Sequence, residues 1–364
     1  MSAEQSPDRV GERVRIGVDA RKLLDDRRGI GRYTRALLRS WAARSQDRVA
    51  ITLLIPDLFP KLLARRLSAE IGAELAVART GARGFDLVWY PWNGMTWIAH
   101  DTKVATVHDC WPFASPAQNS AIRRNEQAPF IRTAEHAACI ITDSGFGKSE
   151  VVRHLGVDPD RIEVVPLGVE TARVGAANPT GAGSASLKPD YVLFVGQAET
   201  RKDLPTLLAA MDLLPEMLRA RFRLVVAGKG QPGSGARLPE HARVEFEGEV
   251  SDERLTQLYA NASAFVFPSR YEGFGLPVLE AMSYGAPVVA SDAASLPEAA
   301  GDAALYFPVG DAAALAAAVG IILYEPALAQ RLRIAGRIRA ASMTWDRCAD
   351  ATLAVFEHVA RARK

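Results

Sequence analysis

Two glutamates, Glu272 and Glu280, flank a glycine-rich turn and the beginning of a predicted helix in the pattern E-x7-E. The apolar run 264–267 before the turn is typical of a buried strand, and Pro277 suits the first turn of a helix. The free amides at a helix N-terminus favour an anion. Carboxylates beside an anion oppose its binding unless they hold another group, such as hydroxyls. A phosphate together with hydroxyl groups indicates a nucleotide sugar.

Arg201 and Lys202 follow an apolar run at 191–195 and precede a predicted helix at 204–218. Positive charge at a helix N-terminus is unfavourable, because the helix dipole repels it there. The two cations are therefore interpreted as facing a diphosphate, which they would neutralise. A solvated pair of charges is the alternative interpretation.

His108 follows the apolar run 104–107, which predicts a position at the carboxyl edge of a sheet. A histidine there can hydrogen-bond a ligand or carry a proton. The alternative is a loop histidine bonded to the backbone. The acidic pair at 158–160 resembles a metal-binding motif, but its place just before an apolar run favours turn chemistry, and we expect no metal.

Apolar runs alternate with helical patterns through both halves of the chain, which predicts an α/β fold with parallel sheets covered by helices. Residues 175–189 are rich in Gly, Ala, Ser and Pro, and are predicted to form an interdomain linker. We expect two doubly wound, Rossmann-like domains, with the ligand between their facing carboxyl edges. The first domain is expected at 1–174 and the second at 190–345, and a C-terminal helix at 346–364 could pack back on the first domain; the family resemblance described below implies that the first is the acceptor-side domain and the second binds the nucleotide sugar. Strands are expected at 14–18, 49–55, 87–90, 104–107, 139–142 and 162–165, and then at 191–195, 224–227, 244–246, 264–267, 288–290 and 305–307.

The composition is that of a globular protein, with 48% hydrophobic and 24% charged residues among 364. A net charge of +2 gives no reason to expect nucleic-acid binding. The three cysteines are scattered, which suits a reducing compartment. No secretory signal and no apolar run of about 20 residues is present, so a cytoplasmic location is expected.

Residues 58–71 form a basic amphipathic pattern that contains Lys61, Arg65 and Arg66. Such a helix can lie on an anionic membrane surface, although an ordinary helix packed on the sheet is the favoured interpretation. Residues 228–233 match the dinucleotide pattern G-x-G-x-x-G, but Pro232 lies inside the turn. These glycines are better explained by a close approach of the backbone to the ligand or to another loop.

Five segments of the chain, taken in order, resemble the retaining glycosyltransferases of family 4, which have the GT-B fold. The segment at 271–292, YEGFGLPVLEAMSYGAPVVASD, is similar to the E-x7-E signature of this family. The first domain is similar to the bacterial polysaccharide branch, which includes O-antigen mannosyltransferases. The other four segments are 16–38, 107–116, 141–169 and 195–204.

The resemblance assigns roles to residues around the donor sugar. It implies that Glu280 binds the ribose hydroxyls and that Glu272 lies at the sugar ring. It also implies that His108 lies near the anomeric carbon and that Lys202, with Glu272 and His108, belongs to the catalytic group. Sugar and phosphate would meet the backbone amides of Gly273, Phe274, Gly275 and Leu276.

The same resemblance implies how the rest of the donor is held. Arg201 and Lys202 would bind the diphosphate, and the loop of Gly29 and Gly31 would approach it from the first domain. One departure concerns Gln197, where many members of the family have an arginine; Arg201 is the candidate replacement. The base would be bordered by Val250, Ser251 and Arg270.

The function implied is the metal-independent transfer of a hexose from a nucleoside diphosphate sugar, with retention of anomeric configuration and no cofactor. GDP-mannose is the favoured donor, and the acceptor is a hydroxyl of a growing lipid-linked surface polysaccharide. The enzyme would work in the cytoplasm, at the inner face of the cytoplasmic membrane. A sugar-nucleotide epimerase of the same fold and a non-catalytic nucleotide-sugar-binding subunit are the alternatives.

Overall fold

The computed structural model describes residues 13–362, apart from 24, 27–28, 57–59, 116–119, 171–189, 198 and 231–238. The predicted linker at 175–189 lies outside the described residues. The chain divides into two compact units, which are described separately. Unit 1 consists of the described residues of Met1–Asp143, Gly147–Pro166 and Trp345–Lys364, and unit 2 of those of Ser144–Phe146 and Leu167–Thr344.

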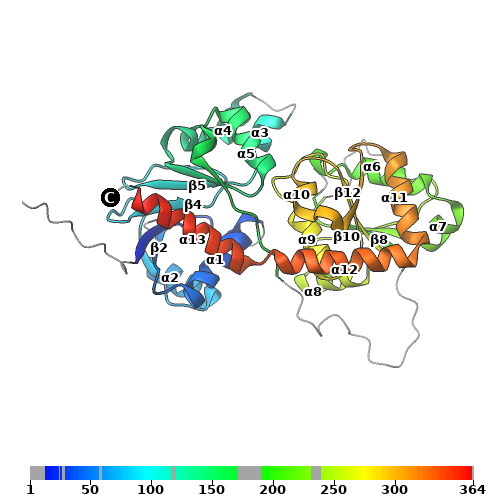
Figure 1. The fold of residues 1–364 in the computed structure, drawn as a ribbon, viewed down its shortest axis with the longest axis horizontal. Coiled ribbons are helices and arrows are strands. Elements are labelled where there is room, and N and C mark those ends of the chain that lie inside the picture. Colours follow the sequence, from blue (N-terminus) through cyan, green and yellow to red (C-terminus); the bar gives the residue numbers. More distant parts are fainter. Residues whose placement is uncertain are drawn as a thin grey trace, which may run out of the picture. The chain divides into compact units, whose positions relative to one another are not determined.

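Unit 1 is built on a seven-stranded parallel sheet with the order β3-β2-β1-β4-β5-β6-β7 (Figure 1). Each strand predicted in the first half is present, and the fold class is confirmed. An additional edge strand, β3, was not predicted, because its four residues are at most half-buried and form no apolar run. The strands are β1 (Val14–Asp19), β2 (Val49–Ile55), β3 (Ala76–Arg79), β4 (Leu87–Tyr90), β5 (Lys103–Val107), β6 (Cys139–Thr142) and β7 (Ile162–Val164).

The C-terminal helix α13 (Trp345–Arg361) belongs to unit 1 and packs against α1 (Ile30–Arg44), as Figure 1 shows in red and blue. Trp41 of α1 is fully buried there, and its indole N–H donates to the carbonyl of Ala349 at 2.9 Å. Phe356 packs on the same indole, with ring centroids 5.7 Å apart. The remaining helices of this part are α2 (Pro60–Ile71), α3 (Trp111–Ala114), α4 (Ser120–His136) and α5 (Gly145–Leu155).

Helix α2 covers most of the segment considered for membrane contact, of which residues 58–59 lie outside the described residues. Leu67 and Ile71 are buried, whereas Arg65 and Arg66 are exposed. Its described apolar side chains are therefore used for packing inside unit 1.

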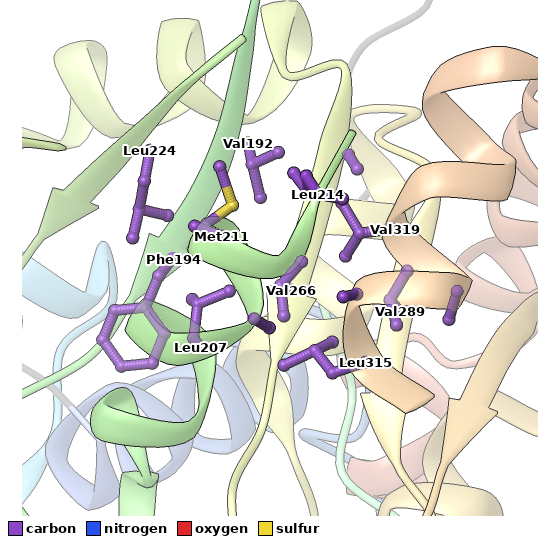
Figure 2. Packing of buried hydrophobic residues seen from close by; sticks show 14 of the residues in the cluster. Val192, Phe194, Leu207, Met211, Leu214, Leu224, Val266, Val289, Leu315 and Val319 are labelled. Atoms are coloured by element: carbon purple, nitrogen blue, oxygen red, sulfur yellow. The ribbon is translucent and has the colours of Figure 1, made fainter. Parts of the chain in front are cut away.

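Unit 2 has a six-stranded parallel sheet with the order β10-β9-β8-β11-β12-β13. One face is covered by α6 (Leu204–Leu213) and α11 (Ala312–Tyr324), whose apolar side chains interdigitate with those of the strands (Figure 2). The strands are β8 (Tyr191–Val195), β9 (Arg223–Ala227), β10 (Val244–Gly248), β11 (Ala264–Phe267), β12 (Val288–Ser291) and β13 (Ala304–Phe307). The other helices are α7 (Glu216–Arg221), α8 (Asp252–Asn261), α9 (Leu276–Ser283), α10 (Leu296–Ala300) and α12 (Pro326–Ser342).

The helix predicted at 204–218 is in fact two helices, α6 and α7. Leu214 is extended, with ψ of 148°, because the proline ring at Pro215 disfavours a helical conformation in the residue before it. Among the described residues, no single helix is long and apolar enough to cross a membrane. Helices α11 and α12 reach that length only together, and they are bent by 99° relative to each other.

Candidate active site

The glycine-rich turn after β11 is shaped by Gly275. Its φ of 104° lies in the left-handed region, and it directly precedes α9. A Cβ at this position would lie 2.6 Å from Cδ2 of Leu296, so any larger residue would force the turn away from α10. The turn thus presents the backbone of Gly273, Phe274, Gly275 and Leu276 at the N-terminus of a helix, where an anion is favoured.

Glu272, Lys202 and Arg201, which were predicted separately, lie together at the ends of the neighbouring strands β8 and β11. Glu272 is only 6% exposed. Its Oε1 lies 2.6 Å from Nζ of Lys202, and its Oε2 lies 3.5 Å from Nη1 of Arg201. Lys202 is 8% exposed, and its ammonium also lies 4.9 Å from the ring centroid of Phe267. This buried cluster of two cations and a carboxylate is the electrostatic centre of the site.

Three fully buried serines hold Glu272 in place. The hydroxyl of Ser269 donates to Oε1 of Glu272 at 2.5 Å, and that of Ser295 donates to the Glu272 carbonyl at 2.9 Å. Ser291 donates to the carbonyl of Ser269. Our sequence reasoning missed these residues. The signal that could have found them is the position of Ser269 just after β11 and of Ser291 at the end of β12.

The turn that carries Arg201 and Lys202 is fixed by Arg270. Asp203 ends this turn with φ of +49°, a conformation uncommon for residues other than glycine. Its Oδ2 accepts from Nη2 of Arg270 and from the hydroxyl of Thr206, each at 2.8 Å. The backbone N–H of Arg270 also donates to the Arg201 carbonyl at 2.7 Å. The structure therefore places Arg270, predicted to border the base, in contact with the turn of Arg201 and Lys202.

Glu280 lies on α9, one turn into the helix, and is half-buried. Tyr259 of α8 donates to its Oε2 at 3.2 Å. The ring of Tyr259 stacks on Tyr284 with 6° between the planes, and this restricts the direction of its hydroxyl. The carboxylate is thus held from one side by a buried phenol.

A cavity of about 320 Å³ lies at the ends of β9 and β10. Gly228 has φ of 137°, and a Cβ there would lie 2.0 Å from the Gly196 carbonyl, so this glycine lets the loop after β9 contact the loop after β8. Lys229 and Glu249 lie at the cavity with Nζ and Oε2 3.3 Å apart. The two residues that follow are Val250 and Ser251, and Ser251 caps α8 by accepting from the Arg254 N–H at 3.2 Å. The cavity is lined by Val226, Gly228, Lys229, Gly230, Phe246, Gly248 and Glu249.

Gly29 and Gly31 belong to unit 1, at the beginning of α1. Gly29 precedes the helix with φ of +52°. The N–H of Gly31 donates to Oδ2 of Asp26 at 3.2 Å, and a Cβ on Gly31 would lie 1.9 Å from the Asp26 carbonyl oxygen. Gly29 thus supplies a positive φ before α1, and Gly31 leaves room for the Asp26 carbonyl that a side chain would obstruct.

His108 lies at the carboxyl end of β5 and is buried. Its Nδ1 lies 2.7 Å from Oδ2 of Asp143, and its Nε2 lies 3.1 Å from the carbonyl oxygen of Pro91. Asn93, with φ of +56°, accepts from the His108 N–H at 2.8 Å. Asp143 and Asn93 were not predicted, because no motif marks them and only the strand order brings them to His108. Among the described residues, no three His, Cys, Asp or Glu side chains are grouped so as to hold a metal ion.

Comparisons with known proteins identify the class. The family model "Glycosyltransferase Family 4" matches residues 27–173, and "Glycosyl transferases group 1" matches residues 182–339. The chain is 33% identical over 269 residues to O-antigen chain mannosyltransferase B of Escherichia coli, covering 71% of this chain and 70% of that protein. The fold is that of a GT-B glycosyltransferase.

Solved structures agree on the fold. Sucrose-phosphate synthase of Thermosynechococcus elongatus has a TM-score of 0.68 at 21% identity, with 96% of this chain and 100% of that chain covered. Anabaena HepE in complex with UDP and glucose has a TM-score of 0.69 at 16% identity, with 95% and 100% covered. The protein belongs to glycosyltransferase family 4, in the branch that includes O-antigen mannosyltransferases.

The change Glu272→Gln should lower the stability of the protein and raise its affinity for a nucleoside diphosphate. Removing one partner of a buried ion pair costs about 3 kcal/mol of unfolding free energy, because Lys202 keeps a charge without its carboxylate. The same change removes an anion that competes for Lys202 and Arg201, so a nucleoside diphosphate should bind more tightly. Denaturant unfolding and calorimetric titration with GDP and UDP measure the two effects.

The matched control is Glu245→Gln, which breaks an exposed pair with Arg223 and should alter neither quantity appreciably. Weaker binding of both nucleotides by Glu272→Gln would show that the carboxylate does not compete with the diphosphate.

Proposed function

We propose that this protein is a retaining, metal-independent glycosyltransferase that moves mannose from a nucleoside diphosphate sugar to a hydroxyl of a growing lipid-linked surface polysaccharide. The observation that carries the proposal is the convergence of Lys202, Arg201 and Glu272 beside the N-terminus of α9. Two cations and free helix amides match a diphosphate, and a carboxylate beside them matches the hydroxyls of a sugar.

The difficult step in such a transfer is the departure of the diphosphate from an oxocarbenium-like sugar. Lys202 and Arg201 would stabilise the growing negative charge, and they are held in place before the reaction begins. Gln197 is exposed and brings no charge, so Arg201 supplies the second cation. These protein cations would take the place of a metal ion.

Glu272 is poorly suited to act as a covalent nucleophile. Its Oε1 is engaged by Lys202 and Ser269, and its Oε2 faces Arg201. An attacking oxygen would have to give up one of these partners. Retention is therefore proposed to result from attack of the acceptor hydroxyl on the face that the diphosphate leaves, with the departing phosphate as the proton acceptor. Glu272 would bind sugar hydroxyls instead.

The donor is proposed to be GDP-mannose. Mannose is supported by the name of the Escherichia coli relative, and a nucleoside diphosphate by the UDP and glucose bound to HepE. Guanine is supported by the cavity at β9 and β10, where Lys229 and Glu249 lie side by side. Guanine presents O6 as an acceptor and N2 as a donor, so an ammonium next to a carboxylate complements its edge. Guanine offers the carboxylate two donors, N1–H and the 2-amino group, whereas uracil offers only N3–H between its two carbonyl groups.

The acceptor is proposed to be a glycan assembled at the inner face of the cytoplasmic membrane, where this enzyme would act peripherally. The support is the name of the Escherichia coli relative, which refers to an O-antigen chain. Helix α2 is not needed for membrane contact in this proposal, because its described apolar residues pack inside unit 1.

The two alternatives differ in what they consume. An epimerase would convert the donor without an acceptor, and a binding subunit would bind the donor without turning it over. The buried, hydrogen-bonded Glu272 and Lys202 favour an intact catalytic site, because a buried ion pair has little value for stability alone.

Replacing Lys202 by alanine should lower the turnover of GDP-mannose by about 100-fold, because a preorganised donor to the leaving group is lost. Release of GDP from GDP-mannose, measured with and without a mannoside acceptor, provides the assay. Arg223→Ala is the control, since that arginine pairs with Glu245 on an exposed strand. Normal turnover by Lys202→Ala would reject the assignment, and consumption of the donor without GDP release would favour the epimerase.

Inosine diphosphate lacks only the 2-amino group of GDP, and it should bind about tenfold more weakly if Glu249 accepts from that group. Glu249→Ala should then bind GDP and inosine diphosphate equally, whereas Glu245→Ala should keep the difference. Isothermal titration calorimetry with GDP, inosine diphosphate and UDP measures this. Preferential binding of UDP would reject guanine but leave the glycosyltransferase proposal intact.

A further inference from the structure

His108 connects the ends of three neighbouring strands in unit 1. Strands β4, β5 and β6 are adjacent, and Val107 is in register with Thr142, so the residues after them emerge side by side. Nδ1 of His108 contacts Asp143, which follows β6, and Nε2 contacts the carbonyl of Pro91, which follows β4. Both side chains are buried, at 9% exposed for His108 and 2% for Asp143.

The partners of the ring determine its protonation state. The carbonyl of Pro91 can only accept a hydrogen bond, and so can an ionised Asp143. Nε2 of His108 must therefore carry hydrogen, and Nδ1 carries one as well when Asp143 is ionised. Burial alone would lower the pKa of His108, but the charge and hydrogen bond of Asp143 more than offset this, and the pKa is raised above its ordinary value. Burial also raises the pKa of Asp143, and the charge and hydrogen bond of His108 oppose that rise.

The other groups around the ring contribute less to its pKa than Asp143 does. Asp109 follows His108 directly, but its carboxylate accepts from the Trp111 N–H at 3.1 Å. Tyr33 of α1 contacts the imidazole edge-to-face at 4.9 Å between centroids, and burial raises the pKa of this phenol well above its ordinary value, so it stays neutral. Asp143 is thus the carboxylate in direct contact with the ring.

Asp143 also has a second, unfilled acceptor. Its Oδ1 is buried and has no hydrogen-bond partner among the residues that the structure describes. A buried carboxylate oxygen without a donor is costly, so it keeps a strong preference for a nearby positive charge or a bound hydroxyl. This makes the imidazolium of His108 the main compensation for the charge of Asp143.

We propose that Asp143 is a positioning residue that holds His108 as a fixed imidazolium across the ends of β4, β5 and β6. In the glycosyl transfer proposed above, on which this role rests, His108 then contributes a positive charge and does not accept a proton from the acceptor hydroxyl, because both of its N–H groups are engaged by Asp143 and Pro91. Asp143 acts through His108 and need not touch the substrate.

The direct test is the protonation state of the ring in the full-length protein. Long-range ¹H–¹⁵N spectra of ¹⁵N-histidine-labelled protein are recorded between pH 5.5 and 9.5, and the His108 signals are assigned with His108→Gln. We expect two protonated nitrogens at pH 8, where an ordinary histidine is neutral. Asp143→Asn should lower the midpoint by at least one pH unit, so that the ring is neutral at pH 8. Asp109→Asn, which removes the neighbouring carboxylate, should shift it far less.

A neutral His108 in the wild-type protein at pH 8, or an unchanged midpoint in Asp143→Asn, would overturn the proposal. If Asp143→Asn does not fold, Asp143→Glu retains a carboxylate and should keep the ring protonated. These spectra need no substrate, so they remain informative if GDP-mannose is not the donor.

The second readout is the pH dependence of GDP-mannose turnover. The wild-type rate should stay level between pH 6 and 8, because His108 remains protonated throughout. In Asp143→Asn the rate should fall by about tenfold per pH unit above the lowered midpoint, as the cation is lost. If Asp143 served only to stabilise the fold, Asp143→Asn would lower the rate equally at each pH. That result would also overturn the proposal.

Discussion

The buried contact between Lys202 and Glu272 is the constraint on which the carboxyl edge of unit 2 depends. The two residues follow β8 and β11, which are neighbours in the sheet although β9 and β10 lie between them in the chain. An unpaired ammonium or carboxylate at this depth would cost several kcal/mol. The loops after β8 and β11 must therefore stay in contact, and the surrounding interactions hold them together. Ser269 and Ser295 hold Glu272, and Arg270 holds the turn before α6 through Asp203.

In unit 1, a different pair of side chains joins the carboxyl ends of neighbouring strands. His108 and Asp143 also follow neighbouring parallel strands, and they also form a buried pair. Parallel strands bring all their carboxyl ends to one edge, so side chains that are distant in the chain meet there. The two pairs differ in what they leave available. Lys202 and Glu272 have a further cation in Arg201, which suits an anion, whereas Asp143 retains an unfilled acceptor.

The sequence was sufficient to predict the fold class, because alternating apolar runs and helical patterns mark most strands of the two parallel sheets. It missed β3, which lies at an edge and is too exposed to form an apolar run. The separate residues of the candidate site could also be singled out, because glycines, carboxylates and cations follow recognisable strands. Their pairing could not, since the contact of Lys202 with Glu272 depends on strand order. For the same reason the contact of Asp143 with His108 could not be predicted, since it depends on the pairing of β5 with β6.

In the function proposed above, the charges around Arg201 indicate how a site whose charges are balanced would receive a diphosphate. Arg201 and Lys202 face Glu199 and Glu272, so the two positive charges are balanced by two negative ones. The carboxylates are not equivalent, because the Glu199 side chain is 40% exposed whereas Glu272 is buried and hydrogen-bonded by Ser269 and Ser295. An exposed ion pair is worth little and can open without a large cost. Glu199 can therefore release Arg201 to an incoming anion, while Lys202 stays fixed on Glu272. On this reasoning Arg201 is the cation that adapts to the donor, and Lys202 is the cation that defines where the diphosphate lies.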